Sequence, residues 1–506
     1  MLIPFYKKLM KEKTHKENHN SYSHILKYTG LFGGVQGLNI LASMVKTKLV
    51  ALILGPNGIG LISLFNSTMG LVGNATGFGL PVGAVKKISE AYDSGDETEV
   101  RETVKLVRSW SLFVALLGTF VCIILSPLLS RYTFSWEGHT LHFICLAPAV
   151  GLTALAGGEV AILKGIRKLR QLAESTVYTS LLGVVLAVPI YYIFGVAAIV
   201  PSLVLLALAN MIIVCVRSYH FYPLKLSFNK NLLKKGRGML RLGTGFMIAG
   251  IFGAGSELIV KSFLNNMAQI EEVGLYNAGY MMTITYTGMV FSAMETDYFP
   301  RLSAIGSEKY KVNQTVNRQI EVTLLILAPM LVAFMVSLPL LLPLLYSKSF
   351  LPAIGMMQFM VLAIYLRAVK LPLAYLPLAK GDALLYLTME GAYAVFYVAL
   401  TIFFYLQYGL SGVGIAILVC AVIDFMMLYV TMHFKYGYGM SRKVARYILL
   451  QFPVGILAYG VTYIQEPIVY WTAGCLLTIL STWISFVILR RKTSLWKKLK
   501  EKVRGK

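Results

Sequence analysis

Charged side chains are scarce in this chain: they make up 14% of its 506 residues. A typical soluble domain carries roughly 25%. Hydrophobic residues make up 57%, and long apolar runs recur along the whole sequence. The scarcity of charge excludes a soluble globular protein. The continuous apolar runs predict an all-α polytopic membrane protein rather than the alternating strands of a membrane barrel.

Cysteine and the common catalytic motifs are also lacking. No two of the five cysteines form a CxxC pair, so we expect neither a disulfide framework nor a zinc site. The chain contains no GxxxxGKS or GxxxxGKT loop, no HExxH and no GxSxG, and its seven histidines show no metal-ligand spacing. We therefore expect no ATP hydrolysis, no metal, no cofactor and no enzymatic activity.

Fourteen apolar segments are long enough to be membrane spans. They cover residues 25–52, 59–84, 109–130, 140–163, 175–195, 198–216, 242–264, 274–299, 321–346, 353–376, 384–405, 411–433, 446–465 and 468–489. The connections alternate between basic segments and short segments that are almost uncharged. Of the 47 lysines and arginines, 40 belong to the basic connections or their flanks, and the short connections hold only Arg131 and Lys348.

The distribution of charge predicts the topology. By the positive-inside rule, the basic connections and both termini are cytoplasmic. The net charge of +24 then reflects topology and attraction to the anionic headgroups of the lipid bilayer. No folded basic domain is present to bind nucleic acid, so we expect no such partner.

Two parts of the chain resemble each other. The segments 26–67 and 240–280 both start with Leu followed by Lys or Arg, and both reach a Val-Lys pair, at Lys46 and Lys261. A Lys-Gly pair recurs at Lys164 and Lys380, and its offset along the chain agrees with that of Lys46 and Lys261 to within a single position. We interpret the match as a parallel repeat of two pseudo-symmetric six-helix lobes, an architecture typical of transporters.

The repeat suggests a division of the chain into six parts. They are a basic cytoplasmic tail (1–24), an N-lobe of spans 1–6 (25–216), a basic linker (217–241), a C-lobe of spans 7–12 (242–433), two extra C-terminal spans (446–489) and a second basic tail (490–506).

Five basic residues fall inside predicted spans, where a charge costs about 2.5–3.5 kcal/mol on insertion scales. Arg367 and Lys370 are three residues apart and share one helix face. A cationic face in a cavity suits an anionic group such as a phosphate. Lys46, Lys48 and Lys261 lie closer to the outer ends of their spans. For all five, the alternative is a side chain that extends to the membrane interface.

Four acidic residues are candidates for ion coupling: Glu159, Glu257, Glu390 and Asp424. Asp424 has only apolar neighbours in the sequence, and a buried carboxylate can hold a proton near neutral pH. The alternative is a polar hydrogen bond between helices. Glu257 lies four residues before Lys261, so the two are predicted to pair on one helix face.

Several motifs resemble a known family. The run from Thr47 to Asp96, with its lysine at position 48 and its Gly-Pro-Asn-Gly-Ile-Gly-Leu turn, is similar to the first hairpin of Wzx-type lipid-linked polysaccharide repeat-unit flippases. Residues 297–303, Asp-Tyr-Phe-Pro-Arg-Leu-Ser, resemble the segment that closes span 8 in that family. The Leu-Lys-Gly sequence at 163–165 also fits.

The resemblance implies a MATE-like fold of the multidrug/oligosaccharidyl-lipid/polysaccharide exporter (MOP) superfamily in a bacterial inner membrane. The implied substrate is an undecaprenyl-pyrophosphate-linked glycan, such as an O-antigen repeat unit, moved by alternating access. A proton or sodium ion would supply the energy, and polysaccharide polymerase machinery is a further partner. The alternatives are a multidrug or cation antiporter of the same superfamily and a membrane glycan polymerase or ligase. Members of the closest branch commonly have twelve spans.

Overall fold

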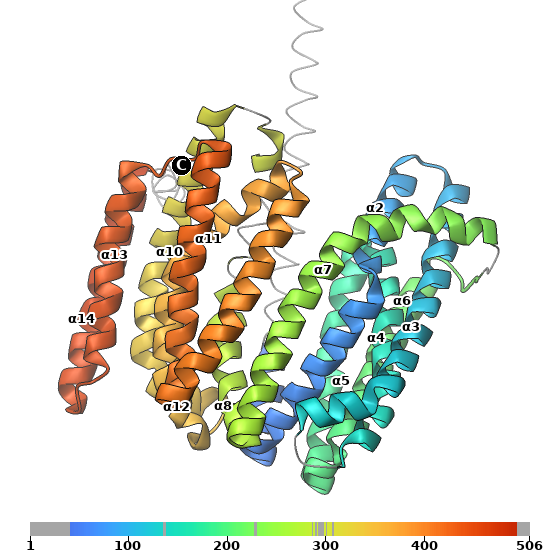
Figure 1. The fold of residues 1–506 in the computed structure, drawn as a ribbon, viewed down its shortest axis with the longest axis horizontal. Helices are drawn as coiled ribbons and strands as arrows, with labels where there is room; N and C mark the ends of the chain where they lie inside the picture. Colours follow the sequence, from blue (N-terminus) through green and yellow to red (C-terminus); the bar gives the residue numbers. More distant parts are fainter. Residues whose placement is uncertain are drawn as a thin grey trace, which may run out of the picture. The chain divides into compact units, whose positions relative to one another are not determined.

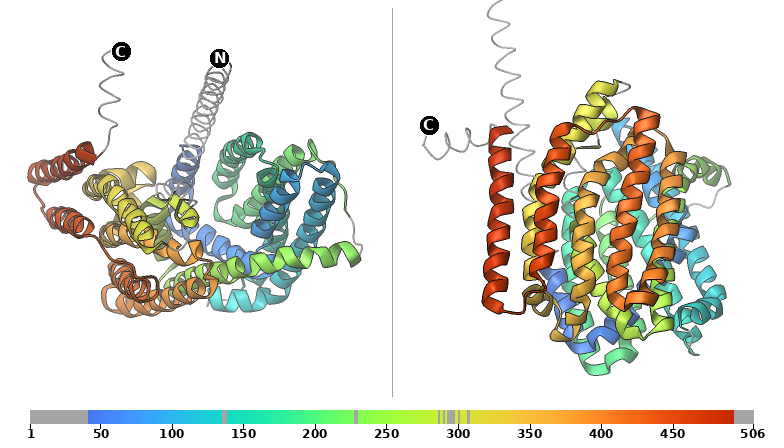
Figure 2. Two further views of the ribbon diagram at one scale, coloured as in Figure 1. Left: turned by 90° about the horizontal axis from the view of Figure 1, so that it is seen from above. Right: turned by 60° about the vertical axis from the view of Figure 1, so that its left-hand side comes forward.

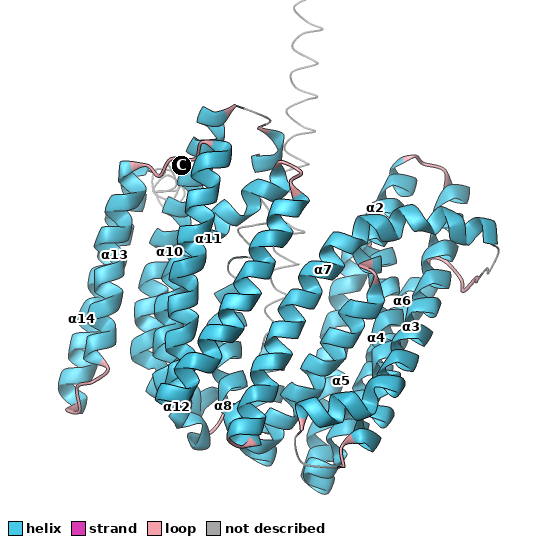
Figure 3. Ribbon diagram, viewed as in Figure 1, coloured by secondary structure: helices cyan, strands magenta, loops and turns pink. Residues whose placement is uncertain are grey.

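The computed structural model describes residues 41–492 except 135–137, 227–229, 286, 289–290, 292–297, 300 and 306–307. The described residues form helices and no strands (Figure 3), which confirms the all-α prediction. Both basic tails (except residues 490–492), the start of the first predicted span and part of the 297–303 motif lie outside the described residues.

The helices follow one another along the chain (Figure 1). They are the helix Leu41–Gly77, α2 (Leu80–Asp93), α3 (Glu97–Thr133), α4 (Thr140–Gly165), α5 (Leu169–Phe194), η1 (Gly195–Ala198), α6 (Ile199–Tyr219), α7 (Lys230–Met267), α8 (Ile270–Tyr280), the π-helical turn η2 (Met281–Thr285), α10 (Lys309–Leu345), η3 (Lys348–Ala353), α11 (Ile354–Ala379), α12 (Ala383–Tyr436), α13 (Arg442–Val461) and α14 (Pro467–Lys492).

Ten helices among the described residues are long and apolar enough to cross a membrane. Two of them, Leu169–Tyr219 and Ala383–Tyr436, contain 51 and 54 residues. A straight helix of this size would be roughly 80 Å long, far more than the roughly 30 Å of a hydrocarbon core. Each is interrupted at a glycine, Gly195 or Gly409, at or next to a predicted connection. The count of fourteen spans stays a prediction.

The two interruptions have the same backbone conformation. Gly195 has φ 59° and ψ −139°, and Gly409 has φ 57° and ψ −142°. This region favours glycine, because a Cβ atom would clash there. The two glycines are separated along the chain by nearly the same offset as Lys46 and Lys261. The two halves of the chain therefore share this local backbone feature at equivalent positions, as the predicted repeat requires.

The helices of the first predicted hairpin end at other residues in the structure than the sequence predicts. Gly55, with φ 63°, interrupts the helix Leu41–Gly77 within the predicted turn. The second span was predicted to reach residue 84, but the helix ends at Gly77 because Phe78 (φ 49°) and Gly79 (φ 60°) are left-handed. A new helix, α2, then begins at Leu80. Hydropathy missed this break because apolar residues continue through it.

The chain forms two compact units. The first unit contains Met1–Ile53, Thr76–Ile124 and Ile144–Thr244, and the second contains Leu54–Ala75, Leu125–Phe143 and Gly245–Lys506. In the first unit, α2, α3 and α4 enclose a core that includes Ile88, Val107 and Ile162. The predicted division into lobes stays a prediction.

The second unit is built around α10 and α11, which bury Leu331 and Ile364 between them. The long α12 packs along α11, and α13 and α14 both pack against α10 (Figure 2).

Two glycines of the repeat make a close helix crossing within the second unit. A Cβ atom on Gly60 would lie 2.2 Å from the carbonyl oxygen of Ile270, and a Cβ atom on Gly274 would lie 1.9 Å from that of Pro56. The contacts are reciprocal, because Pro56 and Ile270 are separated along the chain by the same offset as Gly60 and Gly274. Equivalent residues of the two repeats thus meet around a local pseudo-two-fold axis.

We expect Gly60→Ala to lower the free energy of unfolding by about 1–3 kcal/mol, because the added methyl group would press on backbone atoms. Gly73→Ala, in the same helix, is the matched control, since nothing lies within 4 Å of a Cβ atom there. Thermal unfolding in detergent measures both. Equal melting temperatures for the two variants would show that the crossing is not tight.

Candidate functional site

A largely buried ion pair joins α11 to α12 in the second unit. The ammonium of Lys370 contacts the carboxylate of Asp424, and the two side chains are 21% and 6% exposed. Lys370 lies nine residues before Ala379, the end of α11, which corresponds to roughly 14 Å along the helix. Asp424 is similarly deep in α12. The pair lies too far inside the helices for either charge to be an ordinary interface residue.

Polar and aromatic groups surround this ion pair. The Lys370 ammonium lies 4.8 Å from the ring centre of Tyr393 on α12. Glu390, one turn before Tyr393, interacts electrostatically with Lys370, Asp424 and Arg367. Four charged side chains of opposite signs are therefore gathered between α11 and α12, a grouping that sequence reasoning did not predict. We call Arg367, Lys370, Glu390 and Asp424 the α11–α12 charge cluster.

Arg367 differs from the other members of the α11–α12 charge cluster. Its guanidinium lies 5.5 Å from the ring centre of Phe291. Among the described residues, no carboxylate forms an ion pair with Arg367, whereas Lys370 has Asp424. Arg367 is only half-buried and three residues from Lys370 on the same face of α11. It is the cation of the cluster that is best placed to accept an anionic ligand.

A second polar cluster surrounds Lys261, which is 3% exposed on α7. Its ammonium pairs with Glu257, as predicted from their spacing, and donates hydrogen bonds to the Ser67 hydroxyl at 2.8 Å and the Asn277 side-chain oxygen at 3.4 Å. Ser67 in turn donates to Glu257 at 3.2 Å, and Ser63 donates to Asn277 at 2.8 Å. We call these five residues the Lys261 cluster. Its charges are balanced within the cluster itself.

Buried and half-buried tyrosines lie between the two clusters. Tyr276 on α8 and Tyr397 on α12 share a hydrogen bond, and Tyr397 stacks on Tyr393 with ring centres 6.1 Å apart. Tyr280, on α8, lies near both Glu257 of one cluster and Arg367 of the other. Sequence reasoning missed these tyrosines. The sequence pattern that could have identified them is a spacing of four residues, which places two tyrosines on one helix face. It occurs at Tyr276 and Tyr280 and again at Tyr393 and Tyr397.

Glu159 lies in the first unit, in a buried ion pair that the sequence did not predict. Its carboxylate accepts two hydrogen bonds from Arg108, at 2.8 and 3.1 Å. Arg108 also donates to the carbonyl of Pro223 at 2.8 Å and lies 4.5 Å from the ring centre of Tyr219. Arg108 lies at the end of the predicted connection between the spans 59–84 and 109–130, which the charge distribution predicts to be cytoplasmic. Glu159 is therefore fixed by a bidentate partner on α3.

We expect Glu159→Gln to lower the free energy of unfolding by about 3–5 kcal/mol, because Arg108 would keep its buried charge without a counter-charge. The double variant Arg108→Met with Glu159→Leu is expected to recover most of this loss, since it removes both charges. Thermal unfolding in detergent tests the prediction. If the single variant melts like the wild type, the pair contributes no stability.

The remaining candidates, Lys46 and Lys48, lie in the helix Leu41–Gly77, and both are half-buried. Lys46 lies against α5 in the first unit, where a Cβ atom on Gly183 would be 3.6 Å from its Cδ atom. The structure thus places the nine predicted site residues in three groups: the α11–α12 charge cluster, the Lys261 cluster, and Lys46, Lys48 and Glu159 in the first unit.

Comparison with known proteins identifies a family and a fold. Residues 25–306, more than half of the chain, match the profile described as polysaccharide biosynthesis protein. No curated protein sequence matches the chain significantly.

Several solved structures share the fold. The lipid II flippase MurJ, in an inward closed conformation, matches with a TM-score of 0.72 and 13% identity over 91% of this chain and 99% of MurJ. An inward-facing MATE-family multidrug resistance transporter of the MOP superfamily matches with a TM-score of 0.63 and 17% identity, over 78% of this chain and 94% of that chain. A MOP superfamily transporter from Pyrococcus furiosus matches with a TM-score of 0.54 and 16% identity, over 79% of this chain and 93% of that chain. The predicted MOP fold is confirmed.

Proposed function

The chain belongs to the polysaccharide biosynthesis protein family, and we propose that it is a flippase for an undecaprenyl-pyrophosphate-linked oligosaccharide. It moves this substrate, an O-antigen or other polysaccharide repeat unit, from the cytoplasmic to the periplasmic leaflet of a bacterial inner membrane by alternating access. Both termini are cytoplasmic. The observation that carries the proposal is Arg367, a cation deep in α11 whose guanidinium faces the ring of Phe291.

Arg367 supplies the first contact to the pyrophosphate. A guanidinium presents paired N–H donors that match the oxygens of a phosphate, and it stays charged at every physiological pH. Lys370, one turn away on the same face of α11, supplies the second charge. A diphosphate carries charge on both phosphorus centres, so two adjacent cations suit it better than one.

Asp424 controls whether Lys370 is available. While Asp424 is ionised, it holds the Lys370 ammonium. A proton or a sodium ion on Asp424 cancels its negative charge, and Lys370 is then free to bind a phosphate. Binding of the coupling ion and binding of the substrate therefore favour each other, and by linkage each raises the affinity for the other by the same factor. Glu390 is the second carboxylate close enough to share the ion.

The remaining basic candidates have supporting roles. Lys46 and Lys48 are proposed as further phosphate ligands. Lys261 is already bound to Glu257, Ser67 and Asn277, so it contributes to the pyrophosphate site only after this cluster opens. Glu257 is then released as another carboxylate for the coupling ion.

The alternative is a multidrug or cation antiporter, which holds its cationic substrate on unpaired carboxylates. Asp424, Glu257 and Glu159 are each paired with a basic side chain here, which favours an anionic substrate. A polymerase or ligase is disfavoured by the short outer connections of the sequence. Cooperation with polysaccharide polymerase machinery is part of the proposal.

Ligand binding by the purified protein tests the proposed substrate class. We expect a fluorescent polyprenyl-pyrophosphate glycan to bind, and the same glycan on a polyprenol without phosphate to bind at least about tenfold more weakly, since the charge-assisted contacts are lost. Binding of a cationic dye without binding of the pyrophosphate glycan would favour the antiporter instead.

A further inference from the structure

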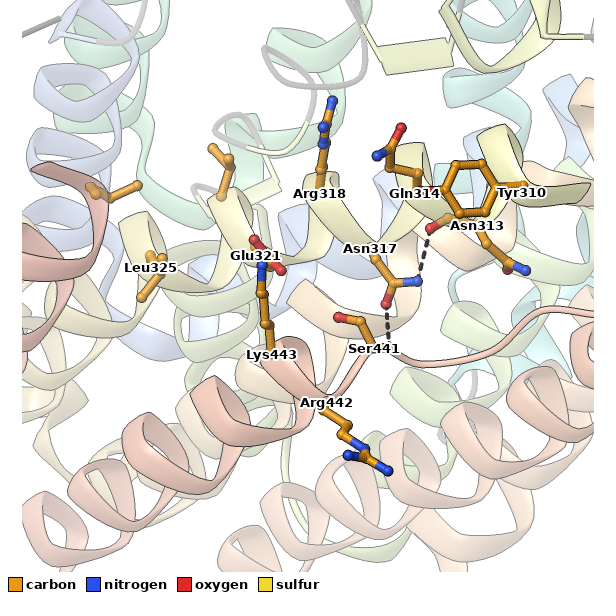
Figure 4. Close-up of a pocket in the computed structure, with 12 residues that line it drawn as sticks. Tyr310, Asn313, Gln314, Asn317, Arg318, Glu321, Leu325, Ser441, Arg442 and Lys443 are labelled. Atoms are coloured by element: carbon orange, nitrogen blue, oxygen red, sulfur yellow. Dashed lines mark hydrogen bonds between the residues drawn. The ribbon is translucent and has the colours of Figure 1, made fainter. Parts of the chain in front are cut away.

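A cavity of about 900 Å³ lies in the second unit, away from both charge clusters and at the end that the charge distribution predicts to be cytoplasmic (Figure 4). It is bounded by the first part of α10, the start of α13 and Leu489 of α14. Three basic side chains, Arg318, Arg442 and Lys443, line it, against one carboxylate, that of Glu321. The described lining therefore carries an excess of two positive charges (three minus one). In Figure 4, Lys443 and Glu321 point toward each other, and the side chains of Arg318 and Arg442 extend in opposite directions.

Side-chain amides hold the floor of the cavity in place. Asn317 donates to the carbonyl of Gly439 at 2.9 Å and accepts from the backbone N–H of Ser441 at 2.8 Å. Asn313 accepts from the backbone N–H of Gly439 at 3.1 Å. These bonds fix the connection before α13 against α10. The cavity is therefore formed in advance and does not require a ligand to bring its walls together.

The exposed face of α10, which we call its outer ridge, changes from polar to apolar side chains at the cavity. Every fourth residue from Tyr310 to Met330 is exposed. The first three are polar or amphipathic and the next three are apolar: Tyr310, Gln314, Arg318, Val322, Ile326 and Met330. On a helix, residues four apart lie above one another on one face. The change from polar to apolar side chains between Arg318 and Val322, within the cavity, is the pattern expected where a helix passes from water into hydrocarbon.

We propose that this cavity binds one anionic phospholipid of the surrounding bilayer. Its phosphate lies over the polar floor of the cavity, where Arg318 and Arg442 supply positive charge from either side, and an acyl chain lies along Val322, Ile326 and Met330. Two observations support this occupant independently: the excess of cations around a preformed polar floor, and the apolar ridge that starts where the cations end. Basic pockets between membrane helices on the cytoplasmic side bind anionic headgroups in this way. The site is separate from the proposed substrate site and does not depend on flippase activity.

Native mass spectrometry of the full-length protein, with either phosphatidylglycerol or phosphatidylcholine added, tests the proposal. We expect the wild type to prefer phosphatidylglycerol, and the double variant Arg318→Gln with Arg442→Gln to lose about 25-fold of this preference, about fivefold for each charge. The Arg→Lys variant at both positions keeps the charges and should keep the preference. The matched control Lys86→Gln with Arg170→Gln removes two exposed cations elsewhere, on α2 and α5, and should also keep it.

Three results would overturn the proposal. They are equal binding of the two lipids by the wild type, an unchanged preference in the double glutamine variant, and displacement of phosphatidylglycerol by inorganic phosphate or by a polyprenyl phosphate. If the glutamine variant does not fold, a photoactivatable phosphatidylglycerol with the wild-type protein decides the question. Labelling should then fall on the peptide that contains Val322, and labelling confined to other helices would refute the site.

Discussion

Replacing Arg367 by alanine is expected to reduce flipping of the pyrophosphate-linked glycan at least about a hundredfold. The guanidinium is proposed to make two charge-assisted hydrogen bonds to one phosphate, together worth about 3 kcal/mol, and this energy corresponds to a factor of about 100 in binding. Arg367→Lys should retain part of the activity, because it keeps the charge but loses the paired geometry. The measurement is the initial flipping rate in proteoliposomes.

The matched control for Arg367 is Arg101→Ala on α3, which removes an exposed arginine that pairs with Glu97, four residues before it. We expect this variant to move the glycan at the wild-type rate, since exposed ion pairs of this kind contribute little to stability. Wild-type flipping by the folded Arg367→Ala protein would remove Arg367 from the mechanism.

The Asp424→Asn variant is expected to separate substrate binding from ion coupling. With asparagine at this position, Lys370 is permanently free, so the pyrophosphate glycan should still bind. The response to the coupling ion should be lost: the flipping rate should no longer change when a proton or sodium gradient is imposed. The flipping rate with and without each gradient measures this, and binding of the glycan is measured in parallel.

Two controls accompany the Asp424 prediction. Asp93→Asn breaks an exposed pair with Arg167 and should leave the gradient response intact. The double variant Lys370→Met with Asp424→Leu removes both buried charges, so it should fold but bind the glycan weakly. If Asp424→Asn responds to the gradients like the wild type, the coupling ion binds elsewhere.

The fold was predictable to the extent that it depends on local patterns. Continuous apolar runs indicated membrane helices, and the recurrence of Lys46 and Lys261 indicated a repeat with which the nearly equal backbone angles of Gly195 and Gly409 agree. The break at Phe78 and Gly79 could not be predicted from hydropathy, because it changes the backbone conformation without changing the polarity of the sequence.

The sequence predicted the individual charged residues of the site, but it did not predict most of the ion pairs that they form. The Glu257–Lys261 pair follows from a spacing of four residues on one helix, and the structure contains it. Lys370 and Asp424 are far apart in the sequence, as are Arg108 and Glu159, so each pair depends on how two helices pack. The sequence therefore suggested cations for the phosphate and carboxylates for the ion as separate sets. The structure combines them, and this is the basis of the proposed coupling.

Transport by the purified protein in proteoliposomes is the most direct test of the central claim. A fluorescent polyprenyl-pyrophosphate glycan and a cationic dye are supplied to the same vesicles, and the movement of each across the bilayer is followed under an imposed ion gradient. We expect movement of the glycan that depends on the gradient, and no movement of the dye. Efflux of the dye without movement of the glycan would contradict it.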